Sequence, residues 1–362
     1  MLEAVSTSIA ASVAQQRYLQ PVAGSEAFPL SVRATLEDEE EADRFGQLAS
    51  RVHAAFVPFA QERGCPPVAI EAVLAVDFLR EVREALADAN DDAADTFKVE
   101  RVGGTVAAKN VALDSDGEVV RVIFDAQLCT NATTAGVAWA VNLIAHEFAH
   151  PFLSRMRASS GALEGVPNPS LTPTQMARSI CRTAADEYRA DSLADLVLGV
   201  VISVTNSQGT EALRYGDLTQ GSYGETVAEA LSTAVWPTLP ELVMSYRIHA
   251  VDLMSMWNRV VQTTDQVFTL LAHAEAEAHS LGLDGPLEAG SATHPASQFL
   301  LRDAWLPVAA MLKEQELLPA VADWREAEEQ LLDVGEACLF EMWQRLGLRP
   351  TDERPDGRFH GS

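Results

Sequence analysis

The stretch from Thr134 to His150 constrains the fold more than any other part of the sequence. It is predicted to be a helix, and it is rich in Ala, Val, Leu, Ile and Trp. A helix this apolar has to be buried, and buried polar side chains need partners. Its main polar side chains, Asn142, His146 and His150, fall within one arc of the helix. We therefore expect one face of a buried helix to meet polar groups from another part of the chain.

The sequence His146-Glu147-Phe148-Ala149-His150 has the spacing of a metal site on a helix. At about 100° per residue, His146 and His150 lie about 40° apart and one turn along, so both imidazoles can reach the same point. Neutral imidazole is a good ligand for Zn²⁺. Glu147 points about 100° away from His146, where it can accept a proton from a metal-activated water without binding the ion. This HExxH pattern predicts His146 and His150 as zinc ligands and Glu147 as a general base.

Two histidines leave a zinc site incomplete, so a third protein ligand is expected elsewhere. A second predicted helix, roughly Thr174 to Leu198, carries Glu187 and Asp191 one turn apart on one face, with Asp195 one turn further. Like charges stacked in this way repel by a few tenths of a kcal/mol per pair, and a cation opposite them removes the penalty. We predict Glu187 as the third ligand and Asp191 as the acceptor that holds the free N–H of a ligating histidine.

Other interpretations of these residues are open. The two histidines could be satisfied core residues, and the carboxylates could form a solvated face neutralised by Arg182 and Arg189. Tyr246 and His249 are weaker candidates for a donor that stabilises a developing oxyanion. A surface or core role is the commoner one for such residues.

HEFAH followed after 36 intervening residues by EYRAD resembles the paired helices of gluzincin-type zinc metallopeptidases. The likeness is closest to the ImmA/IrrE-like group, and the second helix is also similar to that of the prenyl-protein peptidases, which are usually embedded in membranes. It covers about Val119 to Leu198. It implies a zincin-like core in which a strand such as Glu118 to Leu128 edges the cleft and the two helices lie beneath it and close it. It also implies hydrolysis of a peptide or protein substrate.

The remaining sequence predicts an α+β fold that is predominantly helical. Four consecutive regions are expected: an N-terminal helical region (1–95), the zincin-like core with a small antiparallel sheet (96–205), a C-terminal helical region (206–348) and a disordered tail (349–362). Helices are predicted over 45–59, from about 68 to 87, and over 241–281 with a break near Thr263. The sheet is predicted to be a meander of strands at 96–102, 104–113 and 118–128.

Composition excludes several kinds of partner. The formal net charge of −26 would repel polyphosphate, so neither nucleic acid nor an anionic membrane surface is expected to bind. The four cysteines have no CxxC spacing, the N-terminal stretch lacks the basic start of a signal peptide, and the longest uncharged run (126–145) is too polar to span a bilayer. These features favour a cytoplasmic protein, whereas its oligomeric state is not set by the sequence.

A second function class is compatible with the same residues. The chain could be a non-catalytic, metal-stabilised regulatory or interaction protein, and the long helical flanks would suit that role. An ion capped by four protein ligands would favour this alternative, whereas an open coordination position would favour a peptidase.

Overall fold

The computed structural model describes residues 27–89, 91, 97, 100–101, 104–129, 133–161, 172–206 and 209–349. Almost all of the predicted tail and most of the predicted first strand at 96–102 lie outside these residues. The chain divides into two units: one comprises residues 1–161, 190–218 and 320–322, and the other comprises 162–189, 219–319 and 323–362.

The first unit is built on a four-stranded sheet in the order β1-β2-β6-β5. Its strands are β1 (Leu30–Ala34), β2 (Ala69–Ala75), β5 (Ala108–Ala112) and β6 (Val119–Asp125). β1, β2 and β6 run parallel, and only β5 is antiparallel, to β6. The prediction of an antiparallel sheet is therefore wrong: the sheet is mixed, because β1 and β2 come from the region predicted to be helical. β6, at the position of the predicted strand 118–128, is an inner strand, and β5 and β1 form the two edges of the sheet.

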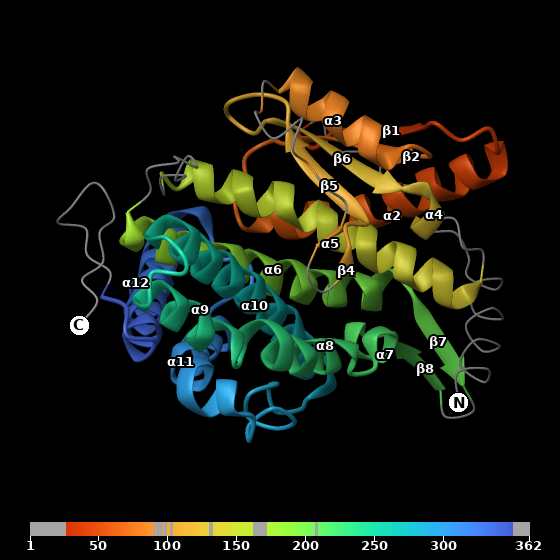
Figure 1. The fold of residues 1–362 in the computed structure, drawn as a ribbon. Coiled ribbons are helices and arrows are strands. Elements are labelled where there is room, and N and C mark those ends of the chain that lie inside the picture. The colour runs from red at the N-terminus through yellow and green to blue at the C-terminus, as the bar shows by residue number, and fades with distance from the viewer. Residues whose placement is uncertain are drawn as a thin grey trace. The chain divides into compact units, whose positions relative to one another are not determined.

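Helices cover both faces of this sheet (Figure 1). Helix α3 (Phe78–Asp88) packs on one face, where its Val82 shares an apolar cluster with Val111 of β5 and Ile123 of β6. Helices α2 (Glu39–Glu62) and α5 (Thr134–Ser159) lie on the other face. There the Phe124 ring of β6 contacts aromatic rings from both helices. The apolar face of α5 is thus anchored to the sheet, which leaves another face for polar side chains.

Helix α5 continues through Pro151, beyond the predicted end at His150. Thr133 caps its start by accepting a hydrogen bond from the Gly136 N–H. A proline inside a helix costs about 3 kcal/mol. Phe152, Leu153 and Met156, which follow it, are each at most 1% exposed. Because burying each such side chain stabilises the fold by about 1.5–3 kcal/mol, their combined burial outweighs the proline penalty and keeps the helix going.

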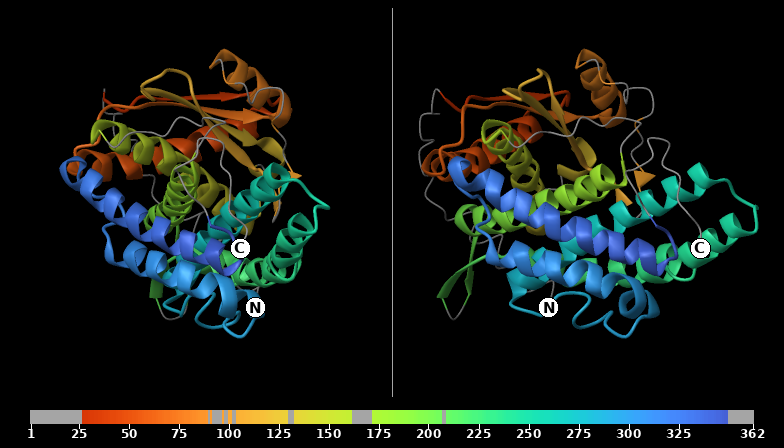
Figure 2. Two further views of the ribbon diagram at one scale, coloured as in Figure 1. Left: turned by 60° about the vertical axis from the view of Figure 1, so that its left-hand side comes forward. Right: turned by 90° about the vertical axis from the view of Figure 1, so that its left-hand side faces the viewer.

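The second unit contains the first part of α6 (Pro173–Val201) and helices α8 (Ser222–Ala230), α9 (Thr238–Arg247), α10 (Leu253–Leu281), α11 (Arg302–Glu314) and α12 (Val321–Arg345). Two π-helical turns, η2 (Leu231–Val235) and η3 (Ser297–Leu301), precede α9 and α11. Figure 2 shows α11 and α12 running alongside each other, and Arg345 of α12 pairs with Asp303 of α11. The indole Nε1 of Trp343 on α12 donates to the Thr264 hydroxyl of α10.

The predicted break near Thr263 is in the wrong place. α9 ends at Arg247, His249 adopts a φ of 61°, and α10 begins at Leu253 after Asp252 caps it through the Ser255 N–H. Thr263 lies inside α10. The capping aspartate and the left-handed turn, rather than a Gly or Pro, separate the two helices.

The smaller elements are the hairpin strands β3 (Glu100–Arg101) and β4 (Gly104–Thr105), the hairpin strands β7 (Ser203–Asn206) and β8 (Gly209–Ala212), and the short helices α4 (Ala126–Cys129) and α7 (Tyr215–Thr219). The predicted α+β class with predominant helix is confirmed. None of the described helices has both the length and the apolar character needed to cross a membrane.

His53 is a buried ionisable side chain in the aromatic layer between α2 and α5. Its side chain faces the rings of Phe148 and Phe152, and its Nε2 has no hydrogen-bond partner among the described residues. Burial lowers the pKa of His53 from 6.5 to about 4. The imidazole is therefore neutral in the folded protein at pH values where the unfolded chain binds a proton.

We expect His53 to destabilise the fold on acidification. Between pH 6.5 and about 4 the unfolded chain binds the extra proton, so the free energy of unfolding falls by up to about 3 kcal/mol over this range. In His53→Leu this contribution disappears, and urea unfolding at pH 7.5, 6 and 4.5 should show a shallower loss of stability than in the parent. Equal losses in the two proteins would contradict a buried neutral His53.

Candidate metal centre

The two histidines of α5 lie at the spacing of two ligands on one ion. His146 Nε2 and His150 Nε2 are 3.2 Å apart. Two ligand atoms that bind tetrahedral zinc at 2.0–2.1 Å are about 3.3 Å from each other. Both histidines are partly buried. The pair forms because residues four apart on a helix share a face.

Asp191 of α6 holds the first of these rings. Its Oδ1 accepts a hydrogen bond from His146 Nδ1 at 2.7 Å, and its Oδ2 accepts one from the Tyr215 hydroxyl at 3.3 Å. The Asp191 side chain is 3% exposed, so the carboxylate is satisfied by these fixed partners. With the proton on Nδ1, Nε2 is the ring nitrogen of His146 that can bind a metal. Asp191 thus makes the contact predicted for it.

Glu187 precedes Asp191 by one turn on the continuous helix α6. One ligand atom each from His146, His150 and Glu187 lie within 4.8 Å of one another. Among the described residues, this is the group of three or more His, Cys, Asp or Glu side chains that could hold a metal ion. The three residues are those predicted as ligands, and two imidazoles with one carboxylate match the donor preference of Zn²⁺.

Glu147 stands beside this group without belonging to it. Its Oε2 accepts a hydrogen bond of 2.5 Å from the Asn110 Nδ2 of β5. Successive side chains on a helix point about 100° apart, so Glu147 points away from the direction of His146. Asn110 was not among the predicted site residues, although an Asn within a predicted strand is a usable signal because Asn is depleted in strands.

The two arginines of the alternative interpretation, Arg182 and Arg189, contact side chains outside α6. Arg182 donates to Glu328, and Arg189 donates to Gln315 and packs over the Trp324 ring. Asp195, the last carboxylate of the face, accepts hydrogen bonds from the Arg214 guanidinium and from the Tyr215 N–H.

His273 of α10 is a second side chain that sequence analysis did not single out. Its Nε2 lies 3.8 Å from Glu187 Oε2, and its ring stacks on Tyr223 of α8 with the ring centroids 5.0 Å apart. An isolated histidine in a long helical pattern gave no signal for this contact. For Tyr246 and His249, no hydrogen bond or ion pair within the described part of the chain joins them to the metal group, and His249 is exposed in the turn after α9.

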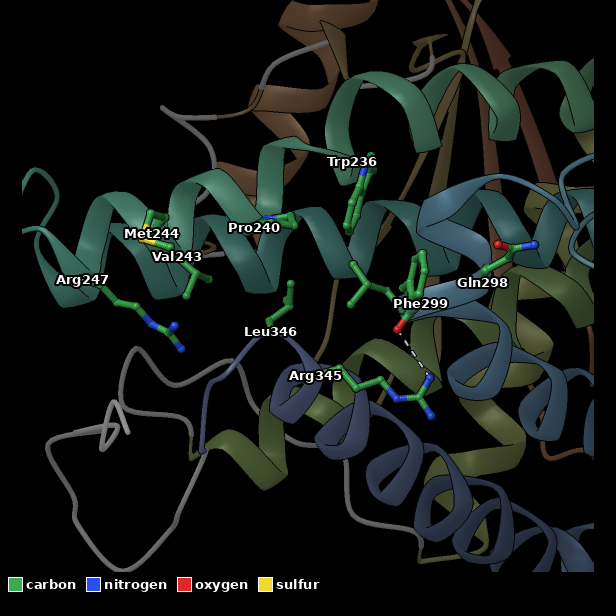
Figure 3. A pocket seen from close by; sticks show the side chains of 10 residues that line it. Trp236, Pro240, Val243, Met244, Arg247, Gln298, Phe299, Arg345 and Leu346 are labelled. Carbon is green, nitrogen blue, oxygen red and sulfur yellow. Dashed lines mark hydrogen bonds between the residues drawn. The ribbon is translucent and has the colours of Figure 1, made fainter.

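The second unit also contains a pocket of about 610 Å³ (Figure 3). Most of its lining residues are apolar, and Arg247, Gln298 and Arg345 are the polar ones. Trp236 and Phe299 form a stacked pair in its wall. None of the residues that line it is a His, Cys, Asp or Glu, so this pocket offers no metal ligands.

No protein-family model matches the chain, and searches of curated proteins and of solved structures gave no significant match.

We expect Asp191→Ala to weaken zinc binding about 10- to 100-fold, because His146 loses the acceptor that fixes its tautomer and ring orientation. Competition with a chromogenic chelator measures this affinity. Asp333→Asn, which alters an exposed carboxylate of α12, is the control and should bind zinc like the parent. An Asp191→Ala protein with the parent's affinity would show that this hydrogen bond does not support metal binding.

Proposed function

We propose that the chain is a zinc-dependent metallopeptidase whose ion is held by His146, His150 and Glu187. The observation that carries the proposal is the convergence of these three side chains, with ligand atoms within 4.8 Å of one another. Three protein ligands are typical of catalytic zinc, because they leave a coordination position for water or substrate. When bound, zinc would lower the pKa of a water molecule to about 7 and polarise a substrate carbonyl.

The residues of the chain itself would handle the proton and the geometry. Glu147 would accept a proton from the attacking water and pass it to the leaving amine, with one of its oxygens held by Asn110. Asp191 would keep His146 in the tautomer that presents Nε2. We propose peptide bonds as the substrate because HEFAH and EYRAD together resemble the gluzincin helices.

A donor for the carbonyl oxygen is best supported at His273. Its imidazole lies against the Glu187 carboxylate and is held by Tyr223, whereas Tyr246 and His249 have no described contact with the metal group. A neutral or protonated imidazole in this position can donate a hydrogen bond to a developing oxyanion.

The alternative of a non-catalytic, metal-stabilised protein has less support. A structural zinc site is closed by four protein ligands, and the group found among the described residues contains three. A purely structural ion also has no use for a carboxylate placed like that of Glu147.

We expect about one zinc ion per chain in protein purified without added metal, and none in His146→Ala, because a histidine and a carboxylate alone form a weak site. Elemental analysis of the two proteins measures this directly. His249→Ala, which removes an exposed histidine, is the control and should retain zinc. Equal metal content in parent and His146→Ala would overturn the metal site.

We expect Glu147→Gln to keep its zinc and lose hydrolysis by about 10²- to 10⁴-fold, because the amide cannot accept the proton. Cleavage of a fluorogenic peptide library measures the rate, and Glu118→Gln, at an exposed carboxylate, is the control. A Glu147→Gln protein as active as the parent would exclude Glu147 as the base. A parent that binds zinc but cleaves nothing would favour the non-catalytic alternative.

A further inference from the structure

Asn110 occupies the middle of β5, the edge strand of the sheet in the first unit. It pairs with Val122 of β6 in the antiparallel register. Side chains alternate between the two faces of a strand, and its neighbour Val111 belongs to the apolar cluster under α3. Asn110 therefore faces the opposite side, toward α5, where its amide meets Glu147.

Packing around Asn110 does not explain why an amide side chain occupies this position. Val122, its register partner, is fully buried, and the next inward-facing residue of β6 is the buried Phe124. Asn has a low strand propensity, and a β-branched residue would fit this face better. The Oδ1 atom of Asn110 is buried without a hydrogen-bond partner among the described residues, which is itself destabilising.

The orientation of the amide is fixed by its partner. Glu147 Oε2 is an acceptor, so the Asn110 Nδ2 must face it, and a flipped amide would set two acceptors against each other. The orphaned Oδ1 is the result of this choice. The hydrogen bond to the Glu147 carboxylate therefore leaves the buried Oδ1 of Asn110 without a hydrogen-bond partner among the described residues.

We propose that Asn110 is a positioning residue for Glu147, an inference that rests on the proposed peptidase function. Its amide restricts the rotation of the carboxylate by binding Oε2, and it leaves Oε1 to exchange the proton. Asn110 touches neither the ion nor the substrate in this role, and it acts on the reaction only through Glu147. A small misplacement of a reacting group slows a reaction by up to about a hundredfold.

The test is Asn110→Val, which removes the amide and fills the apolar face. We expect kcat to fall about tenfold to a hundredfold with KM nearly unchanged and zinc content equal to that of the parent. The urea midpoint should stay the same or rise, since an orphaned buried oxygen is lost and a better strand former is gained. Ala112→Val, two residues along the same strand at an exposed position, is the matched control and should leave kcat unchanged.

Asn110→Asp distinguishes the loss of the hydrogen bond to Glu147 from a change in side-chain volume. It is isosteric but sets a carboxylate against that of Glu147, so its kcat should fall at least as far as that of Asn110→Val. In a Glu147→Ala background, Asn110→Val should have little effect on the residual rate, because the residue through which it acts is missing.

Four results would overturn the inference. A kcat of Asn110→Val equal to that of the parent, or the same fold-loss in the Glu147→Ala background, would show that Asn110 does not act through Glu147. A lowered urea midpoint together with lost zinc would assign Asn110 a structural role. A parent with no peptidase activity at all would instead remove the proposed function, and the inference with it.

Discussion

The hydrogen bond between His146 Nδ1 and Asp191 Oδ1 is the interaction on which the candidate site depends. It satisfies a nearly buried carboxylate and an imidazole at once, and so turns two polar groups that are costly to bury into partners. It also ties the polar face of α5 to α6. Because α6 is one continuous helix, Glu187 lies one turn before Asp191, and its carboxylate is the third member of the group that could hold a metal ion.

Packing on the other side of α5 holds that helix in register. Phe148 contacts Phe124 of the sheet, and Phe152 stacks on Phe56 of α2 with ring centroids 5.5 Å apart. On α5, Phe148 lies between His146 and His150, and Phe152 lies just after His150, so one rotation of the helix sets both the apolar and the polar contacts. The continuation of α5 past Pro151 belongs to this arrangement, since the residues after the proline bury the far end of the helix.

Helical spacing predicted the pairs of site residues that lie on the same helix. The pairs His146 with His150, and Glu187 with Asp191, follow from helical spacing alone. Helix α6 was predicted close to its observed bounds, whereas α5 runs on to Ser159, past its predicted end at His150. The partners that come from distant parts of the chain were missed. Asn110 lies 37 residues before Glu147, and His273 lies in another helix, so no periodicity links them to the site.

The sheet was predicted less well, for a physical reason. β2 is buried between two parallel neighbours and under helices on both faces, so its sequence AIEAVLA lacks the alternation of a half-exposed strand. A short run of this kind cannot be distinguished from a buried helix by its period. Strand β6, with its β-branched residues next to a turn, was recognisable, and the order of strands around it was not.

The most direct measurement is the anomalous scattering, at the zinc absorption edge, from a crystal of protein purified without added metal. The account predicts one strong peak about 2.0–2.1 Å from His146 Nε2, His150 Nε2 and a Glu187 carboxylate oxygen, with a non-protein ligand at the remaining position. A peak bound by other residues, or a Glu187 side chain turned away from a histidine pair that holds no ion, would contradict it.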